Sequence, residues 1–219
     1  MIPRIIHSMW IGDQSKRPTQ TMNTWAVLNP SCQHIVWTEE NLTEFTFANQ
    51  HVIDDMAELN GKCDIMRYEI LQKYGGFFVD ADAECVNTLD DFFFENERFT
   101  CYEHERYGID EESGLPRLSS GYLAFCPQDP FLAICIAELG KVDVVGKQAW
   151  EVVSNKFLAV LVNKYKEEYP MTIYPSWYFI PKHAISQPWN DVEYKGADKI
   201  YAKHLWGSTF GLYGTDTIK

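Results

Sequence analysis

The chain has 219 residues, a net charge of −12 and an aromatic content of 15%, which indicates a globular protein with a core rich in rings. We expect neither nucleic acid nor an anionic membrane surface as a partner, because both require basic patches. No stretch approaches the run of about 18 apolar residues that spans a membrane. The six cysteines lack metal-type spacing, and no signal-like segment opens the chain, so we expect free thiols and a cytoplasmic location.

The first part of the chain alternates strand-like and helix-like segments, as in an α/β domain. The expected elements are a strand within 2–12, a helix at 21–28, a strand at 33–37 and helical residues at 45–59. His7 and Trp10 stand near the carboxyl end of the first strand, where ligands of α/β proteins bind. From the residues alone, the favoured interpretations are ordinary core packing for Trp10 and a hydrogen-bonded histidine of the core for His7.

The most informative stretch is residues 62–85, KCDIMRYEILQKYGGFFVDADAEC. Its apolar spacing predicts a helix that ends at the glycine pair 75–76, since glycine accepts the left-handed conformation of a helix terminus. Phe77 to Val79 then suit a buried strand. If the strand continues, Asp80 and Asp82 point to one side, roughly 6–7 Å apart.

Two ionised carboxylates side by side repel each other, and burying them is costly. A hard divalent cation offsets both problems, and Mg²⁺ or Mn²⁺ is commonly held by one or two carboxylates together with substrate phosphates. Asp64 and Arg67 lie three residues apart on the preceding helix. Their spacing alone favours an ion pair on a solvated face over a role beside the ligand.

The second part of the chain continues the alternation. The expected elements are a strand at 99–103, a mobile surface loop at 103–116, a strand at 119–126, a helix from Asp129-Pro130 to 139–140, a long helix at 150–169 and a strand at 171–180. An alternative for the loop is a lid over a second substrate. Gly121 within its strand allows close approach of another group.

Three ordered segments of the chain resemble glycosyltransferase family 32: IPRIIHSMWIG at 2–12, KCDIMRYEILQKYGGFFVDADAEC at 62–85 and YAKHLWGSTF at 201–210. This group includes yeast-type initiating mannosyltransferases and is related to the clostridial glucosylating toxins. The resemblance implies a single GT-A domain over residues 1–219, with a mixed, mostly parallel central sheet flanked by helices. It also implies a metal-dependent, retaining transfer from a nucleotide-sugar, with UDP-hexose favoured and GDP-mannose as the alternative, to a glycan or other hydroxyl acceptor.

The resemblance also assigns roles to particular residues. It implies catalytic roles for Asp80, Asp82 and Arg67, substrate contacts for His7, Trp10, Asp64, Arg67, Phe78, Asp80 and Ser208, and ligation of Mn²⁺ or Mg²⁺ by Asp82, His204 and Asp80. In this scheme Trp10 stacks on the nucleotide base, while the segment with His204 and Ser208 closes over the donor.

The chain departs from the pattern at Phe210, where relatives carry a tryptophan that Trp206 could replace. No carboxylate stands out as a covalent nucleophile, so we expect a front-face substitution. Two other functions stay open at this point, namely a sugar-nucleotide-binding protein without activity and a metal-dependent phosphohydrolase. The sequence does not predict the oligomeric state.

Overall fold

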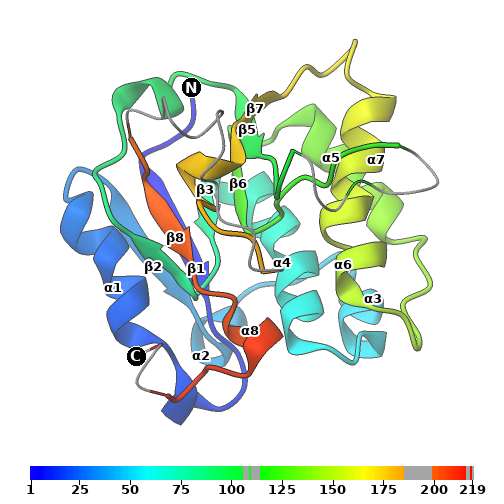
Figure 1. Cartoon of the computed structure of the whole chain (residues 1–219). Helices are drawn as coiled ribbons and strands as arrows, with labels where there is room; N and C mark the ends of the chain where they lie inside the picture. The colour runs from blue at the N-terminus through cyan, green and yellow to red at the C-terminus, as the bar shows by residue number, and fades with distance from the viewer. Residues whose placement is uncertain (106–108, 110–113, 185–198, 216–217, 219) are drawn as a thin grey trace.

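A six-stranded sheet with the order β2-β1-β3-β6-β5-β7 forms the centre of the computed structural model, which describes residues 1–105, 109, 114–184, 199–215 and 218 (Figure 1). Its strands are β1 (Ile5–Met9), β2 (Gln33–Trp37), β3 (Gly76–Val79), β5 (Arg98–Cys101), β6 (Tyr122–Phe125) and β7 (Thr172–Tyr174). The β1–β2, β1–β3 and β5–β7 pairs are parallel, and β6 runs antiparallel to β3 and β5. The expected mixed, mostly parallel sheet is confirmed.

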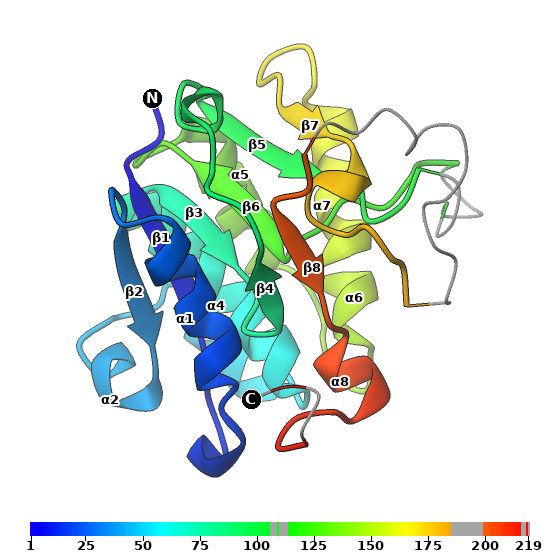
Figure 2. The same ribbon diagram turned by 60° about the vertical axis from the view of Figure 1, so that its left-hand side comes forward.

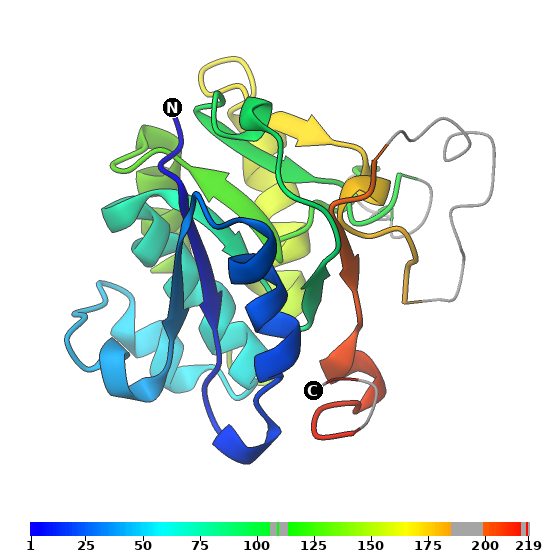
Figure 3. The ribbon, with the colours of Figure 1, turned by 90° about the vertical axis from the view of Figure 1, so that its left-hand side faces the viewer.

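Both faces of the sheet are covered. One face packs against a cluster that contains side chains of α3 (Gln50–Asp55), α4 (Leu59–Tyr74), α5 (Pro130–Leu139), α6 (Ala149–Val152) and α7 (Asn155–Lys164). The other face is covered by α1 (Thr19–Leu28) and by a two-stranded ribbon of β4 (Ala83–Cys85) and β8 (Ala202–His204), as Figure 2 and Figure 3 show. Because alternate strand residues face opposite sides, Phe77 and Val79 pack under α1 while Phe78 packs under α4.

The short elements complete the chain. They are α2 (Glu39–Leu42), α8 (Gly207–Phe210) and the 3-10 turns at Gln14–Lys16, Asp91–Phe93 and Ser176–Tyr178. In the part of the chain that the structure describes, no helix has the length and apolar character needed to cross a membrane.

The junction between α4 and β3 follows the sequence closely. Gly75 closes α4 with φ +62° and donates its N–H to the Leu71 carbonyl at 2.7 Å, and Gly76 begins β3 with φ +100°. Both values lie in the region that favours glycine. A Cβ on Gly76 would also press against the Ile5 carbonyl, so the pair sets how closely β3 lies beside β1.

The two carboxylates do not lie on a strand. β3 ends at Val79, residues 80–82 form a turn in which the Ala83 N–H donates to the Asp80 carbonyl at 3.1 Å, and β4 begins at Ala83. The prediction that a continuing strand aligns Asp80 and Asp82 is therefore wrong, because the chain turns at this point and enters the ribbon. The turn nevertheless brings the two side chains together.

Three other predicted elements also differ. The helical residues at 45–59 form only α3 before α4 begins, and the strand at 171–180 shortens to β7 followed by a 3-10 turn. The helix at 150–169 divides into α6 and α7 at Val153-Ser154, because Ser154 turns its hydroxyl toward the neighbouring Ser120 and Asn155 side chains.

The predicted loop at 103–116 lies partly outside the described residues. At its start the surface interpretation is wrong, since Glu103 and His104 are buried.

Candidate metal centre and pocket

A pocket of about 560 Å³ opens at the edge of the sheet where β1 and β3 end. Its wall includes the 80–82 turn, residues 119–121 before β6, and residues 206–209 of the carboxy-terminal segment. The carboxyl ends of parallel strands are the usual position for a ligand in an open α/β sheet, and the volume suits a small organic molecule.

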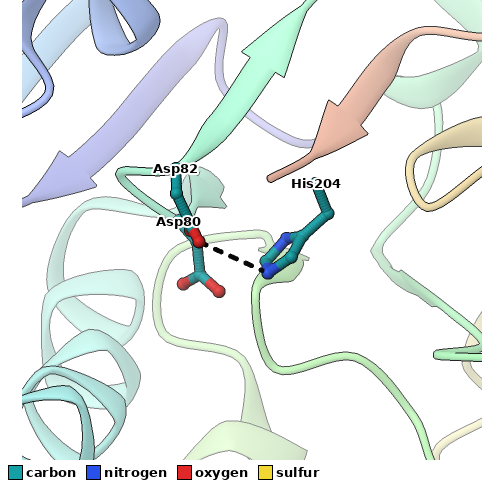
Figure 4. Close-up of side chains that lie close together, drawn as sticks. All are labelled: Asp80, Asp82 and His204. Atoms are coloured by element: carbon teal, nitrogen blue, oxygen red, sulfur yellow. Dashed lines mark ion pairs between the residues drawn. The ribbon is translucent and has the colours of Figure 1, made fainter. Parts of the chain in front are cut away.

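Asp80, Asp82 and His204 converge on one side of this pocket. One potential ligand atom from each residue lies within 4.8 Å of the others, and the His204 Nε2 lies 3.8 Å from the Asp82 Oδ2 (Figure 4). The ribbon brings His204 to this place, because β8 pairs with β4 in a register that sets His204 opposite Ala83. Residues more than a hundred positions apart thus form one cluster.

The carboxy-terminal segment also fixes the Asp82 carboxylate. The Gly207 backbone N–H donates to the Asp82 Oδ2 at 2.6 Å, and the Leu205 N–H donates to the Asp82 carbonyl at 3.0 Å. Asp82 is buried, so its orientation is determined before any ligand binds.

The cluster fits a divalent cation. It offers two carboxylates and an imidazole, a donor set that suits Mn²⁺ better than Mg²⁺ because Mn²⁺ tolerates nitrogen ligands. The His204 Nδ1 is buried and has no hydrogen-bond partner among the described residues, so protein contacts do not saturate this ring.

Arg67 connects α4 to the metal cluster. Its guanidinium pairs with Asp64 at 2.9 Å and with Asp80 at 2.8 Å, and it donates to the Ser120 carbonyl. The interpretation of Asp64 and Arg67 as a solvated ion pair is wrong, because both side chains are buried at the pocket. The same guanidinium lies 4.9 Å above the Phe78 ring, which also lines the pocket.

The two aspartates beside Arg67 titrate in opposite directions. Burial would raise the pKa of Asp80, but the charge of Arg67 and the hydrogen bond from its guanidinium outweigh burial and lower that pKa. Burial raises the pKa of Asp64 to about 6, against the attraction of Arg67. Asp80 is therefore the carboxylate that stays ionised for a cation, while Asp64 serves to hold Arg67.

Trp10 and Ser208 lie on the wall of the pocket, as a substrate contact requires. The Trp10 ring packs edge-on against Tyr213 at 4.8 Å, and its indole N–H donates to the Asp13 carbonyl at 3.0 Å. Ser208 is exposed on α8.

Trp206, rather than Phe210, faces the cluster. The Trp206 ring lies 4.4 Å from His204, whereas Phe210 is 52% exposed and does not line the pocket. The indole N–H of Trp206 donates to the Lys182 carbonyl at 3.0 Å. Trp206 therefore supplies the aromatic ring beside His204, while its indole N–H is already used in the hydrogen bond to Lys182.

His7 does not reach the pocket. Its Nδ1 accepts from the Trp37 indole at 3.1 Å, its Nε2 donates to the Gly75 carbonyl at 2.8 Å, and its ring stacks on Phe78. Burial lowers the pKa of His7 to about 4, so the ring is neutral. The structure places this residue in the sheet interior, where it joins β1 to the α4–β3 junction, and not on the wall of the pocket where the predicted substrate contact requires it.

Several residues that line the pocket are not among those predicted from the sequence. They are Glu103, Ser120, Trp150, Ser154, Asn155 and Tyr213. Glu103 was not selected because it begins an acidic stretch that is typical of a surface loop. Ser154 and Asn155 were not selected because they lie within a segment whose pattern predicts one continuous helix. Only the helix-breaking tendency of a Ser-Asn pair could have indicated the division between α6 and α7.

Comparisons with known proteins identify a related family and a related fold. Residues 15–99 match the family described as "Glycosyltransferase sugar-binding region containing DXD motif". "Inositol phosphoceramide mannosyltransferase 3" of Schizosaccharomyces pombe is 32% identical over 96 residues, which are 41% of this chain and 26% of that protein. "Inositol phosphoceramide mannosyltransferase 1" of the same yeast is 29% identical over 148 residues, or 64% of this chain and 43% of its own length. The chain thus spans less than half of either relative.

A solved structure extends the comparison beyond the matched segment. The "PaToxG Glycosyltransferase" shares the fold with a TM-score of 0.53 and 14% identity, over 76% of this chain and 70% of that one. The resemblance found in the sequence and the expected GT-A fold are confirmed.

Proposed function

We propose that this protein is a metal-dependent enzyme that moves a hexose from a nucleotide-sugar to a hydroxyl acceptor, because residues 15–99 match the sugar-binding region of the DXD glycosyltransferases. The observation that carries the proposal is the convergence of Asp80, Asp82 and His204 on a pocket large enough for such a donor.

The residues of the cluster and those around it have different proposed roles. Asp80, Asp82 and His204 would hold Mn²⁺ or Mg²⁺, which, when bound, supplies a positive charge for the diphosphate leaving group. Arg67, oriented by Asp64, keeps the Asp80 carboxylate in place and ionised. An acidic protein can in this way bind an anionic donor.

The proposed donor is UDP-hexose, with its base against Trp10, whose ring is fixed by Tyr213 and by the Asp13 carbonyl. GDP-mannose is the second candidate, supported by relatives that are named mannosyltransferases.

We propose a front-face reaction that retains the anomeric configuration. The acceptor oxygen bonds to the anomeric carbon, the bond from that carbon to the diphosphate breaks, and the acceptor proton passes to the leaving phosphate oxygen. Asp64 is paired with Arg67, and both oxygens of Glu103 accept hydrogen bonds, from His183 and from Asn155. These contacts favour front-face transfer over a covalent intermediate on either carboxylate.

A screen of nucleotide-sugars for Mn²⁺-dependent thermal stabilisation tests the proposal. A donor at 100 times its Kd adds roughly 2.7 kcal/mol to stability. Release of nucleoside diphosphate from the stabilising donor indicates an enzyme, and stabilisation without release indicates a binding protein instead. Phosphate release from simple phosphate esters would favour a phosphohydrolase.

We also propose a cytoplasmic location. The six cysteines form no disulfide, which suits a reducing compartment.

A further inference from the structure

The pocket extends to both sides of the 80–82 turn. In the strand order, β1 lies on one side of β3, while β6 and β5 lie on the other. Trp10 follows β1, whereas Ser120 precedes β6 and Glu103 follows β5, and all three line the pocket. If the nucleotide occupies the Trp10 side, the side formed by β6, β5 and the α6–α7 corner is left for a second substrate.

Trp150 presents a fixed aromatic ring on this second side. The ring lines the pocket from α6 and is 38% exposed. The Arg117 guanidinium lies 4.3 Å above the ring, and the indole N–H donates to the Gln148 Oε1 at 2.6 Å. A ring held in this way loses little freedom when a ligand packs against it.

Hydrogen-bonding groups line the same side of the pocket as this ring. Glu103 is joined to Arg117 by its backbone N–H, which donates to the Arg117 carbonyl at 3.0 Å. The Glu103 side chain is buried and accepts from His183 at 2.9 Å and from the Asn155 Nδ2 at 2.7 Å. Burial would raise the pKa of Glu103, but these hydrogen bonds outweigh it and lower that pKa, so the carboxylate is ionised.

The polar groups form a connected chain that leads back to the metal cluster. The Asn155 Oδ1 accepts from the Ser120 hydroxyl at 2.8 Å, and the Ser120 carbonyl accepts from Arg67, which pairs with Asp80. The second side is therefore built against the reaction centre and is not a separate surface feature.

We propose that Trp150, Glu103 and Asn155 form the acceptor subsite, and that the acceptor is a carbohydrate. This inference rests on the proposed function. A sugar ring has an apolar C–H face and a rim of hydroxyl groups. The electron-rich face of an indole suits the first. The Glu103 carboxylate suits the second, because its oxygens have lone pairs beyond those used by His183 and Asn155, and the Asn155 Nδ2 has a second N–H beyond the one given to Glu103.

The test compares Trp150→Ala with Trp150→Phe and with the matched control Phe92→Ala. Phe92 is also 38% exposed, but it does not line the pocket. Aryl glycosides of the common hexoses serve as acceptor probes, and the KM values for glycoside and for donor are measured in the full chain with Mn²⁺. Trp150→Ala should raise the glycoside KM at least about tenfold, which is ~1.4 kcal/mol, and raise the donor KM much less. Trp150→Phe should restore most of the difference, and Phe92→Ala should change neither constant.

A second measurement separates this inference from the proposed function. Calorimetric titration of the same glycosides into protein with Mn²⁺ and nucleoside diphosphate reports acceptor binding without turnover. Binding that weakens about tenfold in Trp150→Ala, in a protein that never turns over donor, would support the subsite and contradict the transferase. An unchanged glycoside KM and affinity in Trp150→Ala, or no glycoside binding by the wild type, would overturn the subsite.

Discussion

Gly207 donates its backbone N–H to the Asp82 carboxylate at 2.6 Å, although the two residues are 125 positions apart in the chain. The contact ties the carboxy-terminal segment to the 80–82 turn and aims the carboxylate into the metal cluster. Because the hydrogen-bond donor is the Gly207 backbone N–H, a neutral side chain of the same shape at position 82 can keep this hydrogen bond. It would lose the charge that a cation requires.

Asp82→Asn should therefore preserve the fold and abolish metal-dependent donor binding. Asparagine still offers an oxygen to the Gly207 N–H, but it is a much weaker ligand for a divalent cation. We expect turnover to fall by roughly 100-fold or more, beyond the 10- to 100-fold effect of losing an outer partner of a metal site. Calorimetric titration of Mn²⁺ into the protein, in the presence of the nucleotide-sugar that stabilises it, measures the Mn²⁺ affinity. The control is Asp91→Asn, which removes an exposed carboxylate that pairs with Arg4. Unchanged Mn²⁺ affinity in Asp82→Asn would contradict the site.

Gly121→Ala should disturb the same centre from the opposite wall. A Cβ at this position would collide with the Asp80 carboxylate, so that carboxylate must shift, which disturbs its position in the cluster and its pairing with Arg67. We expect weaker Mn²⁺ binding and slower turnover, with both effects visible in a Mn²⁺ titration of activity. Gly140→Ala is the matched control, because its Cβ would crowd the Asn49 side chain far from the pocket, at a φ of −61° that alanine accepts. Equal Mn²⁺ dependence in the two variants would show that Asp80 is not a ligand.

These residues show how far the sequence leads. The local sequence of 62–79 is enough to predict a helix, a stop at the glycine pair and a buried strand. The structure has α4, the glycine junction and β3 at these positions. The meeting of Asp80 and Asp82 was expected for the wrong reason, since a turn and not a strand brings them together. Gly121 was expected to admit a close neighbour, but only the fold shows that the neighbour is Asp80.

The rest of the site depends on contacts between distant segments. His204 reaches the turn through the β4–β8 pairing, and strands of three residues are too short to be predicted from their sequence. Its role as a metal ligand is expected only from the family resemblance. Glu103 and Asn155 meet across 52 positions, and no local pattern selects them. Burial of Asp64 and Arg67 also follows from the sheet and helices around them, because their spacing fits a solvated ion pair equally well.

Trp10→Ala should weaken donor binding by roughly 10- to 100-fold, because stacking of a base on an aromatic ring contributes about 1–3 kcal/mol. Trp10→Phe should recover part of the loss, since it keeps a ring but loses the hydrogen bond to the Asp13 carbonyl. Titration of the nucleoside diphosphate, with Mn²⁺ present, measures the effect without the sugar. Equal affinities for Trp10→Ala and the wild type would place the base elsewhere in the pocket.

The buried His7 gives the fold a dependence on pH that is separate from catalysis. Its pKa is lowered to about 4 by burial, against an ordinary value of 6.5. Between these two values the unfolded chain binds a proton at this position and the folded chain does not. This contribution to stability is therefore fully present above pH 6.5, is lost as the pH falls toward 4, and changes no further below 4. The size of the loss is about 3 kcal/mol.

Urea denaturation at a series of pH values from 7.5 to about 4 tests this assignment. His7→Gln should be less stable at neutral pH, because glutamine cannot reproduce both the contact with the Trp37 indole and that with the Gly75 carbonyl. Its stability should nevertheless fall less steeply than that of the wild type as the solution is acidified, since no imidazole remains to be protonated on unfolding. The matched control, His51→Gln, changes an exposed histidine and should keep the shape of the wild-type curve. A His7→Gln curve parallel to that of the wild type would show that other groups, such as His34, cause the acid sensitivity.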